Sequence, residues 1–319
     1  MKNTKQEYNS LLYLISQPLF LGIGFIKIIR NLENDYWIGI ILGVIIGLFI
    51  NYILHLLPHN NNKIIFTLIN ICILLIITTI LTNCISLLYL NKTPINIILI
   101  PLLIVAIYSS TKGDETIFKA ANIIVLINVF LFTIAFISLI PLISINNFLP
   151  IIGNSSIISI LLSSLDFALI STTSLILFPN LKKNYNYKVY LVSSLTIVTF
   201  FLLIIGTLGI NVASIFNYPE YIIFKRVSFL DFFDNIQNII FMMWIFSSFS
   251  LIGLCSLNIR KNTNKKILLI IMIFIFLISN IIGNYNLFNF IYLNIRYLLL
   301  IILGLFILNK IISKLKLKK

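Results

Sequence analysis

Repeated apolar runs of membrane length constrain the fold of this chain more than any motif does. The runs are about 20 residues long and nearly free of charge, which is the length that an α-helix needs to cross about 30 Å of hydrocarbon. Of 319 residues, 60% are hydrophobic and 10% are charged, and the mean hydropathy is +1.07. Because a helix satisfies its own backbone hydrogen bonds in lipid, the sequence predicts an all-α polytopic membrane protein.

Apolar length and flanking polarity predict about ten transmembrane helices. Their expected ranges are 10–29, 37–57, 64–90, 94–109, 117–143, 156–178, 188–210, 231–258, 266–283 and 287–309. The polar connections are too short for a water-soluble domain. We therefore expect a single transmembrane domain over 1–319 with short tails at both ends.

Basic residues are divided unequally between the two sides of the predicted membrane. If the N-terminus is cytoplasmic, the outer side receives only Lys27, Arg30, Lys92, Lys225 and Arg226, and most lysines fall on the inner side. Positive charge is retained inside, so both termini are expected to be cytoplasmic. The net charge of +14 then indicates an anionic inner leaflet and not nucleic acid.

The helix count also predicts internal symmetry. Ten helices divide into two halves of five, and an odd number of helices inverts the second half relative to the first. This topology is typical of a 5+5 inverted-repeat, LeuT-like transporter fold with interrupted helices 1 and 6 and a site between them. The repeats are expected at about 10–143 and 156–309, from topology alone, because the halves show no obvious sequence repeat.

Two glycines stand one residue apart in the middle of the first span. Gly22 and Gly24 each weaken a helix by about 1 kcal/mol relative to alanine, so we expect the helix to open there. Irregular backbone at membrane depth must line a cavity or be buried in protein. Gly22, Ile23 and Gly24 are therefore candidate residues of a small-molecule site at the midplane. Close packing against a neighbouring helix through small residues is the alternative interpretation.

The sixth span is the most polar membrane stretch in the chain and would face the first. Its candidate ligand-binding side chains are Ser163, Ser164, Asp166, Ser171 and Thr172. These hydroxyl and carboxylate groups could bind a ligand that the opened backbone of the first span also contacts.

Asp166 and Arg296 are ionisable residues that the predicted spans place inside the hydrocarbon. Each costs several kcal/mol there unless it is paired or faces water, so both are functional candidates. One interpretation is an ion pair between the sixth and tenth spans. In the other, Asp166 faces the cavity as a site for a ligand amine or a proton, and Arg296 extends to the interface or contacts a partner subunit.

Three glycines, Gly39, Gly43 and Gly47, lie four residues apart in the second span and so share one helical face. This spacing favours close helix packing over a ligand role. His55 and His59 flank Pro58 at the inner end of the same span and are interpreted as interfacial residues.

The sequence gives no indication of an enzyme. It contains no phosphate-binding loop, no nucleophile elbow and no paired metal ligands, so we expect no cofactor and no metal. Cys72, Cys84 and Cys255 lie inside apolar runs without metal-ligand spacing and are interpreted as small hydrophobic residues.

The connection between the seventh and eighth spans carries the first familiar pattern. Tyr218-Pro219 predicts a turn, and residues 222–227 predict an amphipathic helix in the membrane interface. The acidic Asp234 follows, with Trp244 ten residues later. This order resembles the B-subunit family of bacterial spore germinant receptors, the GerAB and GerKB type of spore germination permease, within the amino acid-polyamine-organocation transporter superfamily.

Further matches to this family extend over residues 10–310. They are Gly22-Ile23-Gly24, Asn34-Asp35-Tyr36-Trp37, the inner connection from Tyr108 to Gly113 with Glu115 and Lys119, and Asn147-Phe148-Leu149-Pro150. The chain departs from the family pattern at Asn235 and Gln237, where charged residues are usual, and at Lys27, where proline is usual.

The resemblance implies a ligand-sensing B subunit in the inner membrane of the bacterial endospore. Such a subunit would bind a small nutrient germinant such as an amino acid, with Trp244 as an apolar wall of the pocket, and would signal through A-type and C-type partner subunits. A stand-alone, proton-coupled amino acid permease and a structural subunit that binds no ligand are the alternatives.

Overall fold

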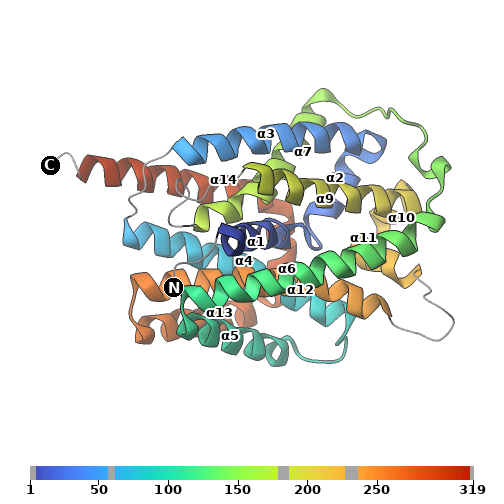
Figure 1. Ribbon diagram of the computed structural model, residues 1–319. Coiled ribbons are helices and arrows are strands. Elements are labelled where there is room, and N and C mark those ends of the chain that lie inside the picture. The colour runs from blue at the N-terminus through green and yellow to red at the C-terminus, as the bar shows by residue number, and fades with distance from the viewer. Residues whose placement is uncertain (1–4, 57–61, 179–186, 227–235, 317–319) are drawn as a thin grey trace.

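The computed structural model describes residues 5–56, 62–178, 187–226 and 236–316, and all regular structure in these residues is helical. The long helices are α3 (Tyr36–Leu56), α4 (Lys63–Leu88), α5 (Ile95–Lys112), α6 (Asp114–Leu139), α7 (Ile157–Thr172), α9 (Tyr187–Leu208), α12 (Ile236–Asn262), α13 (Lys265–Ile282) and α14 (Asn284–Lys316). They run roughly side by side in a bundle (Figure 1). The prediction of an all-α polytopic membrane protein is confirmed.

Shorter elements form the first span and the connections. The first span consists of α1 (Lys5–Ile15), the 3₁₀ turn η1 (Pro18–Phe20) and α2 (Gly24–Leu32). The others are η2 (Glu33–Asp35), η3 (Ile140–Leu142), η4 (Ile145–Phe148), η5 (Thr173–Leu177), α10 (Ile210–Ile215), α11 (Pro219–Ile222) and η6 (Ile223–Arg226).

Nine helical segments of the described chain are long and apolar enough to cross a membrane. The difference from the ten predicted spans arises in the first one, which is divided into two pieces of 11 and 9 residues, α1 and α2. The second piece continues through η2 into α3, so that Gly24–Leu56 counts as one segment. Each of the ten predicted ranges therefore has a helical counterpart. The sixth span changes from α to 3₁₀ geometry at Thr173.

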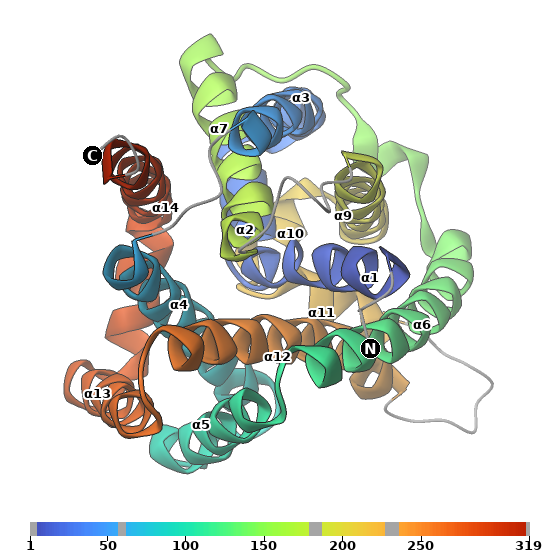
Figure 2. The ribbon, with the colours of Figure 1, turned by 60° about the vertical axis from the view of Figure 1, so that its left-hand side comes forward.

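The divided first span lies at the centre of the bundle (Figure 2). α1 packs against α6, α9 and α12, and α2 packs against α7. On the inward face of α1 and along α2, most side chains are fully buried. A break at this position is surrounded by protein, as the rule for irregular backbone in a membrane requires.

The helix contacts follow an offset of five spans. α4 packs on α14 as α12 packs on α6, α1 on α6 as α7 on α14, and α3 on α7 as α9 on α1. Two copies of one five-helix unit would produce such matched pairs. The contacts therefore support the 5+5 repeat, which stays a proposal.

The glycine face of α3 packs closely on α7 and α9. A Cβ on Gly43 would lie 2.7 Å from Cβ of Phe167, and one on Gly47 would lie 1.8 Å from the Tyr190 hydroxyl. Neither approach leaves room for a methyl group. The prediction that these glycines serve helix packing is confirmed.

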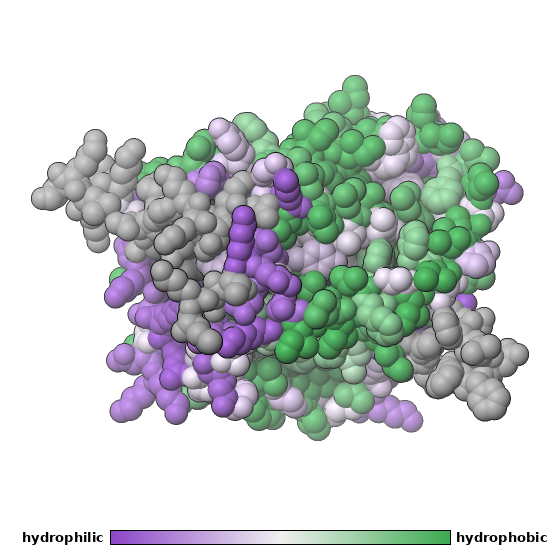
Figure 3. All heavy atoms as spheres, viewed as in Figure 1, coloured by the Kyte–Doolittle hydropathy of each residue, from purple (hydrophilic) through white to green (hydrophobic). Residues whose placement is uncertain are grey.

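Hydrophilic and hydrophobic side chains occupy different parts of the surface. Hydrophobic residues dominate the middle of the face in Figure 3, and hydrophilic residues gather at its left end. The start of α1 and the end of α14 both lie toward that end in Figure 1. This arrangement agrees with termini on one side of the membrane. His59, Pro58, Asp234 and Asn235 lie outside the described residues.

Candidate functional site

The first span opens where its glycines predict. α1 ends at Ile15, and the chain then passes through η1 and a turn before α2 begins at Gly24. Gly22 has a φ of 63°, in the left-handed region where a side chain is strained. The residues of the break are all buried. Backbone groups that a continuous helix would pair internally therefore need partners from elsewhere in the protein.

Both glycines of the break also permit close packing. A Cβ on Gly22 would lie 2.3 Å from Cε1 of Tyr218, and one on Gly24 would lie 2.5 Å from Cδ1 of Phe20. The two interpretations of this stretch, an opened helix and close packing through small residues, therefore apply together.

Glu220 on α11 is a hydrogen-bond partner of the backbone in the break. Its Oε1 accepts a hydrogen bond from the Gly22 N–H at 2.7 Å, and the side chain is fully buried. Its Oε2 has no hydrogen-bond partner among the described residues. Next to it, the Tyr218 hydroxyl donates to Asn83 Oδ1 at 2.8 Å. α11 lies in the connection between α9 and α12, outside the spans, and burial raises the pKa of Glu220 to about 8 against the opposing effect of the Gly22 hydrogen bond.

For the segment around Glu220, the sequence predicts a turn followed by an interfacial helix. This expectation is wrong for the described part, because Ile223 and Phe224 are fully buried in the protein. Glu220 is the only acidic residue between Asp166 and Asp231 and follows directly on Tyr-Pro, and this is the signal that could have identified it.

Asp166 and Arg296 form a bidentate ion pair between α7 and α14. Arg296 Nε donates to Asp166 Oδ1 at 2.6 Å, and a second guanidinium nitrogen donates to Oδ2 at 2.7 Å. Lys27 Nζ lies 3.9 Å from the same Oδ2. Of the two interpretations, the geometry is that of the ion pair. Both carboxylate oxygens are occupied, so Asp166 is not free to receive a ligand amine in this conformation.

The hydroxyl groups predicted as ligand-binding on the sixth span differ in their hydrogen bonds. Ser164 donates to Leu161 O, Thr172 donates to Ala168 O, and Ser171 bonds both Ala168 O and the Tyr190 hydroxyl. These hydroxyls are satisfied within the protein. Ser163 is also buried, but its Oγ has no partner in the described part of the chain. Of the predicted hydroxyls, Ser163 is therefore the one without a described hydrogen-bond partner.

Trp244 on α12 lies against the outer half of the broken span. Its ring meets Phe25 edge-on with centroids 5.5 Å apart, and it lies 5.2 Å from the Phe200 ring. The indole is buried, and Nε1 has no hydrogen-bond partner among the described residues. Buried polar atoms without partners are uncommon and call for a ligand, a water or a conformational explanation.

Aromatic rings fill the space between the break and the sixth span. Phe20 lies 5.1 Å from Phe167 and 5.8 Å from Phe25, measured between ring centroids, and Phe25 lies 4.7 Å from Phe201. The structure thus brings the break, the sixth span and Trp244 together around one aromatic cluster. In this conformation these rings pack between the three predicted parts of the pocket.

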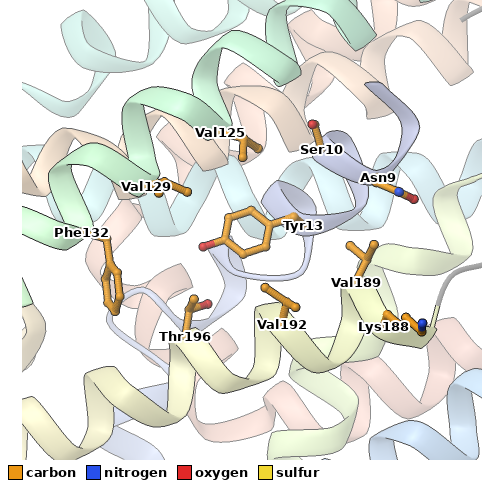
Figure 4. A pocket seen from close by; sticks show the side chains of 10 residues that line it. All are labelled: Asn9, Ser10, Tyr13, Val125, Val129, Phe132, Lys188, Val189, Val192 and Thr196. Carbon is orange, nitrogen blue, oxygen red and sulfur yellow. The ribbon is translucent and has the colours of Figure 1, made fainter. Parts of the chain in front are cut away.

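An open cavity of about 400 Å³ lies beside the break, between α1, α6 and α9 (Figure 4). Its lining residues are Asn9, Ser10, Tyr13, Val125, Val129, Phe132, Lys188, Val189, Val192 and Thr196. None of the predicted site residues lines it. One wall residue, Thr196, accepts a hydrogen bond from Gln17 Nε2 at 3.3 Å, which links the cavity wall to the start of the break.

A second cavity, of about 440 Å³, lies at the other end of the bundle and is largely polar. Asn34, Asn147 and Pro150 are among its lining residues, so it joins two of the segments that resemble family motifs. Asp35 connects the same segments, because its carboxylate accepts from Gly153 N–H at 2.7 Å and from Ser155 N–H at 2.9 Å. These motif residues hold the connections around the outer ends of the helices.

The described residues contain no group of three or more His, Cys, Asp and Glu side chains that could hold a metal ion. The site is instead built from backbone N–H, hydroxyl, indole and carboxylate groups around a broken helix. Helices broken at membrane depth are typical of transporter folds, where they contact small ligands.

Fold and site together define a multi-pass, transporter-like membrane protein with an interrupted first helix. Comparison with protein families identifies the group within this class. Residues 63–288 match the family model for spore germination proteins, the spore permeases, and the chain belongs to this family. No curated protein sequence matches the chain significantly.

Proposed function

We propose that the protein is the B subunit of a spore germinant receptor, which binds a small nutrient germinant, an amino acid, and signals germination through partner subunits. Membership in the spore germination protein family supports a role in germination. The observation that supports the choice of ligand is the hydrogen bond from the Gly22 N–H to the Glu220 carboxyl group, because a carboxyl oxygen already fits against the opened backbone of the broken helix. An amino acid carries the same group.

The geometry supports specific roles for residues around the break. The N-terminal end of α2 carries positive partial charge, which favours a ligand carboxylate at the Gly22 N–H. Ser163 Oγ and Trp244 Nε1 are buried hydrogen-bonding groups without described partners, and the Trp244 ring supplies an apolar wall. The aromatic rings between them would move apart to admit a ligand.

The proposal includes location and partners. The protein would lie in the inner membrane of the endospore with both termini on the core side, and it would act with A-type and C-type subunits. Ligand binding shifts such a complex only by its differential affinity for two conformations. The aromatic packing between the break and the sixth span, and an arrangement in which these rings part around a ligand, would be two such conformations.

One observation favours a second candidate, a proton-coupled amino acid permease. Coupling needs a protonatable group in the pathway, and the ion pair with Arg296 occupies Asp166. Glu220 is a second buried carboxylate, is not part of any ion pair in the described residues, and contacts the break directly. Uptake of labelled amino acid into proteoliposomes under a proton gradient tests this candidate, since a receptor subunit would give none.

Germination of spores carrying Ser163→Ala tests the leading proposal. Ser164→Ala is the matched control, because it removes the same atom from the adjacent buried residue, whose hydroxyl is satisfied by Leu161 O. At equal abundance in the spore inner membrane, we expect Ser163→Ala to shift the concentration dependence for one germinant and Ser164→Ala to leave it unchanged. Identical responses to every amino acid in a panel would favour the structural-subunit alternative.

A further inference from the structure

The contact between Glu220 and Gly22 joins residues 198 positions apart in the chain. It is fixed from two directions. α11 begins at Pro219 and carries Glu220 inward, while the Tyr218 ring covers Gly22 and its hydroxyl is tied to Asn83 on α4. A segment between two spans thus seals the break from one side.

The environment of Glu220 is poor in compensating charge. None of the ion pairs among the described residues includes it, and the described titratable groups that interact with it are Cys84 and Tyr218, with Tyr221 as its neighbour in the chain. Its Oε2 has no described partner. A fully buried carboxylate is costly without a cation, so its one strong contact, the N–H at the start of α2, determines where it lies.

We propose that the Glu220 carboxylate occupies, in the unliganded protein, the backbone position that binds the ligand's carboxylate, and that ligand binding exchanges one carboxylate for the other. This inference rests on the proposed function and adds the ligand class, a small carboxylate-bearing molecule, and the event that follows binding. The exchange releases Tyr218 and α11 from the break. Because α11 lies between α9 and α12, its movement reaches two spans that pack against α1.

Protonation of Glu220 provides an independent test of the exchange. A protonated Glu220 is a weaker acceptor for the Gly22 N–H than an ionised one and does not repel an incoming carboxylate. Since the other titratable neighbours are thiol and phenol groups, the apparent affinity for a carboxylate should rise as the pH falls through about 8. Glu220→Gln, which keeps an acceptor oxygen without a charge, should abolish that dependence.

Cys84 offers a direct readout of the seal. It is fully buried next to Glu220, whereas Cys72 is exposed and Cys255 is buried elsewhere on α12. A parent protein with Cys72→Ser and Cys255→Ser therefore reports on this position alone. The full chain in lipid nanodiscs is treated with a small charged methanethiosulfonate, and the rate of Cys84 modification is measured with and without sodium acetate, L-alanine or methylamine.

The expected results have a definite pattern. Acetate and L-alanine accelerate modification of the parent, and methylamine does not. At a pH above 8, where Glu220 is ionised, Glu220→Ala accelerates it without any ligand, on the order of tenfold, the equivalent of one lost charge-assisted hydrogen bond. In Glu220→Ala and Glu220→Gln the acetate concentration for a half-maximal effect falls, because the internal competitor is gone or weakened. Glu115→Ala, which changes an exposed glutamate on α6, is the control and behaves like the parent.

A purely structural role for Glu220 predicts the opposite change in the affinity of the variants for acetate. Removing a structural cap would loosen the site. The variants would then bind acetate more weakly than the parent or with the same affinity, and either result overturns the proposed exchange. Thermal unfolding confirms that each variant is folded, and Glu220→Gln serves if Glu220→Ala does not fold. If acetate acts and no amino acid does, the exchange stands and the proposed amino acid ligand fails. If L-alanine stabilises the protein without affecting Cys84 at all, the proposed function stands and the exchange fails.

Discussion

Arg296 holds Asp166 through two nearly parallel hydrogen bonds, of 2.6 and 2.7 Å, that connect the middle of α14 to the middle of α7. Lys27 on α2 adds a second cation at 3.9 Å. Asp166 is therefore the shared anion of three elements, and the two cations are not equivalent.

This asymmetry predicts unequal effects of breaking the pair. Asp166→Asn leaves two cations without a counter-charge and should lower the free energy of unfolding by about 3–5 kcal/mol. Arg296→Met should cost less, because Lys27 remains close enough to compensate Asp166. Thermal unfolding in detergent measures both. Equal losses would show that Lys27 does not contribute.

Gly22→Ala should destabilise the protein through two separate effects. The positive φ alone costs about 1–2 kcal/mol for a residue with a Cβ. The new methyl group would also meet the Tyr218 ring at 2.3 Å. Gly113→Ala tests backbone strain without a steric clash, since Gly113 has a φ of 84° and a ψ of 177°, a region that residues with a Cβ avoid, with nothing within 4 Å of its virtual Cβ. We expect the loss of unfolding temperature at Gly22 to exceed that at Gly113, and equal losses would contradict the packing argument.

Gly47→Ala should disrupt the packing of α3 on α9, with a specific partial rescue. The atom that a Cβ would meet at 1.8 Å is the Tyr190 hydroxyl oxygen, and the next, Cζ, is at 2.9 Å. Tyr190→Phe removes the first atom at the expense of the bond to Ser171. In thermal unfolding, the double variant should therefore be more stable than Gly47→Ala alone. Additive losses would place the clash elsewhere.

Glu220 should give the protein a stability that declines with pH. Its folded-state pKa of about 8 lies above the ordinary value of 4.5, so the folded protein binds the proton more tightly than the unfolded chain does. The contribution is complete below pH 4.5 and is lost as the pH rises to about 8, a change of a few kcal/mol at full burial. The unfolding temperature of wild type relative to Glu220→Gln should fall over this range. A constant difference would mean that Glu220 titrates normally.

Much of the fold follows from local patterns in the sequence. Apolar length locates the spans, Gly22 and Gly24 locate the break, and the glycine spacing on α3 locates a packing face, because each effect depends on neighbouring residues alone. Span ends are less accurate: the fifth span was expected over 117–143, and α6 extends over Asp114–Leu139. The 5+5 repeat and the ligand roles of the site residues stay predictions.

The site was harder to predict because it depends on contacts between distant segments. The polarity of the sixth span suggested several ligand-binding hydroxyls, yet serine and threonine in a helix commonly bond the carbonyl three or four residues before them, as Ser164 and Thr172 do. Glu220 was not predicted because its position depends on a contact with a distant segment of the chain. Nothing local shows that a residue in a connection enters the core and caps a helix 198 positions earlier.

The cluster of Lys27, Asp166 and Arg296 also determines the local charge beside the break. With formal charges, two partly buried cations adjoin one buried anion, which leaves one positive charge in surplus. In a medium of low polarizability such a charge repels other cations over several ångströms and attracts anions. The junction of α2, α7 and α14 is therefore a part of the helix bundle where a further anionic group is favoured over a further cationic one.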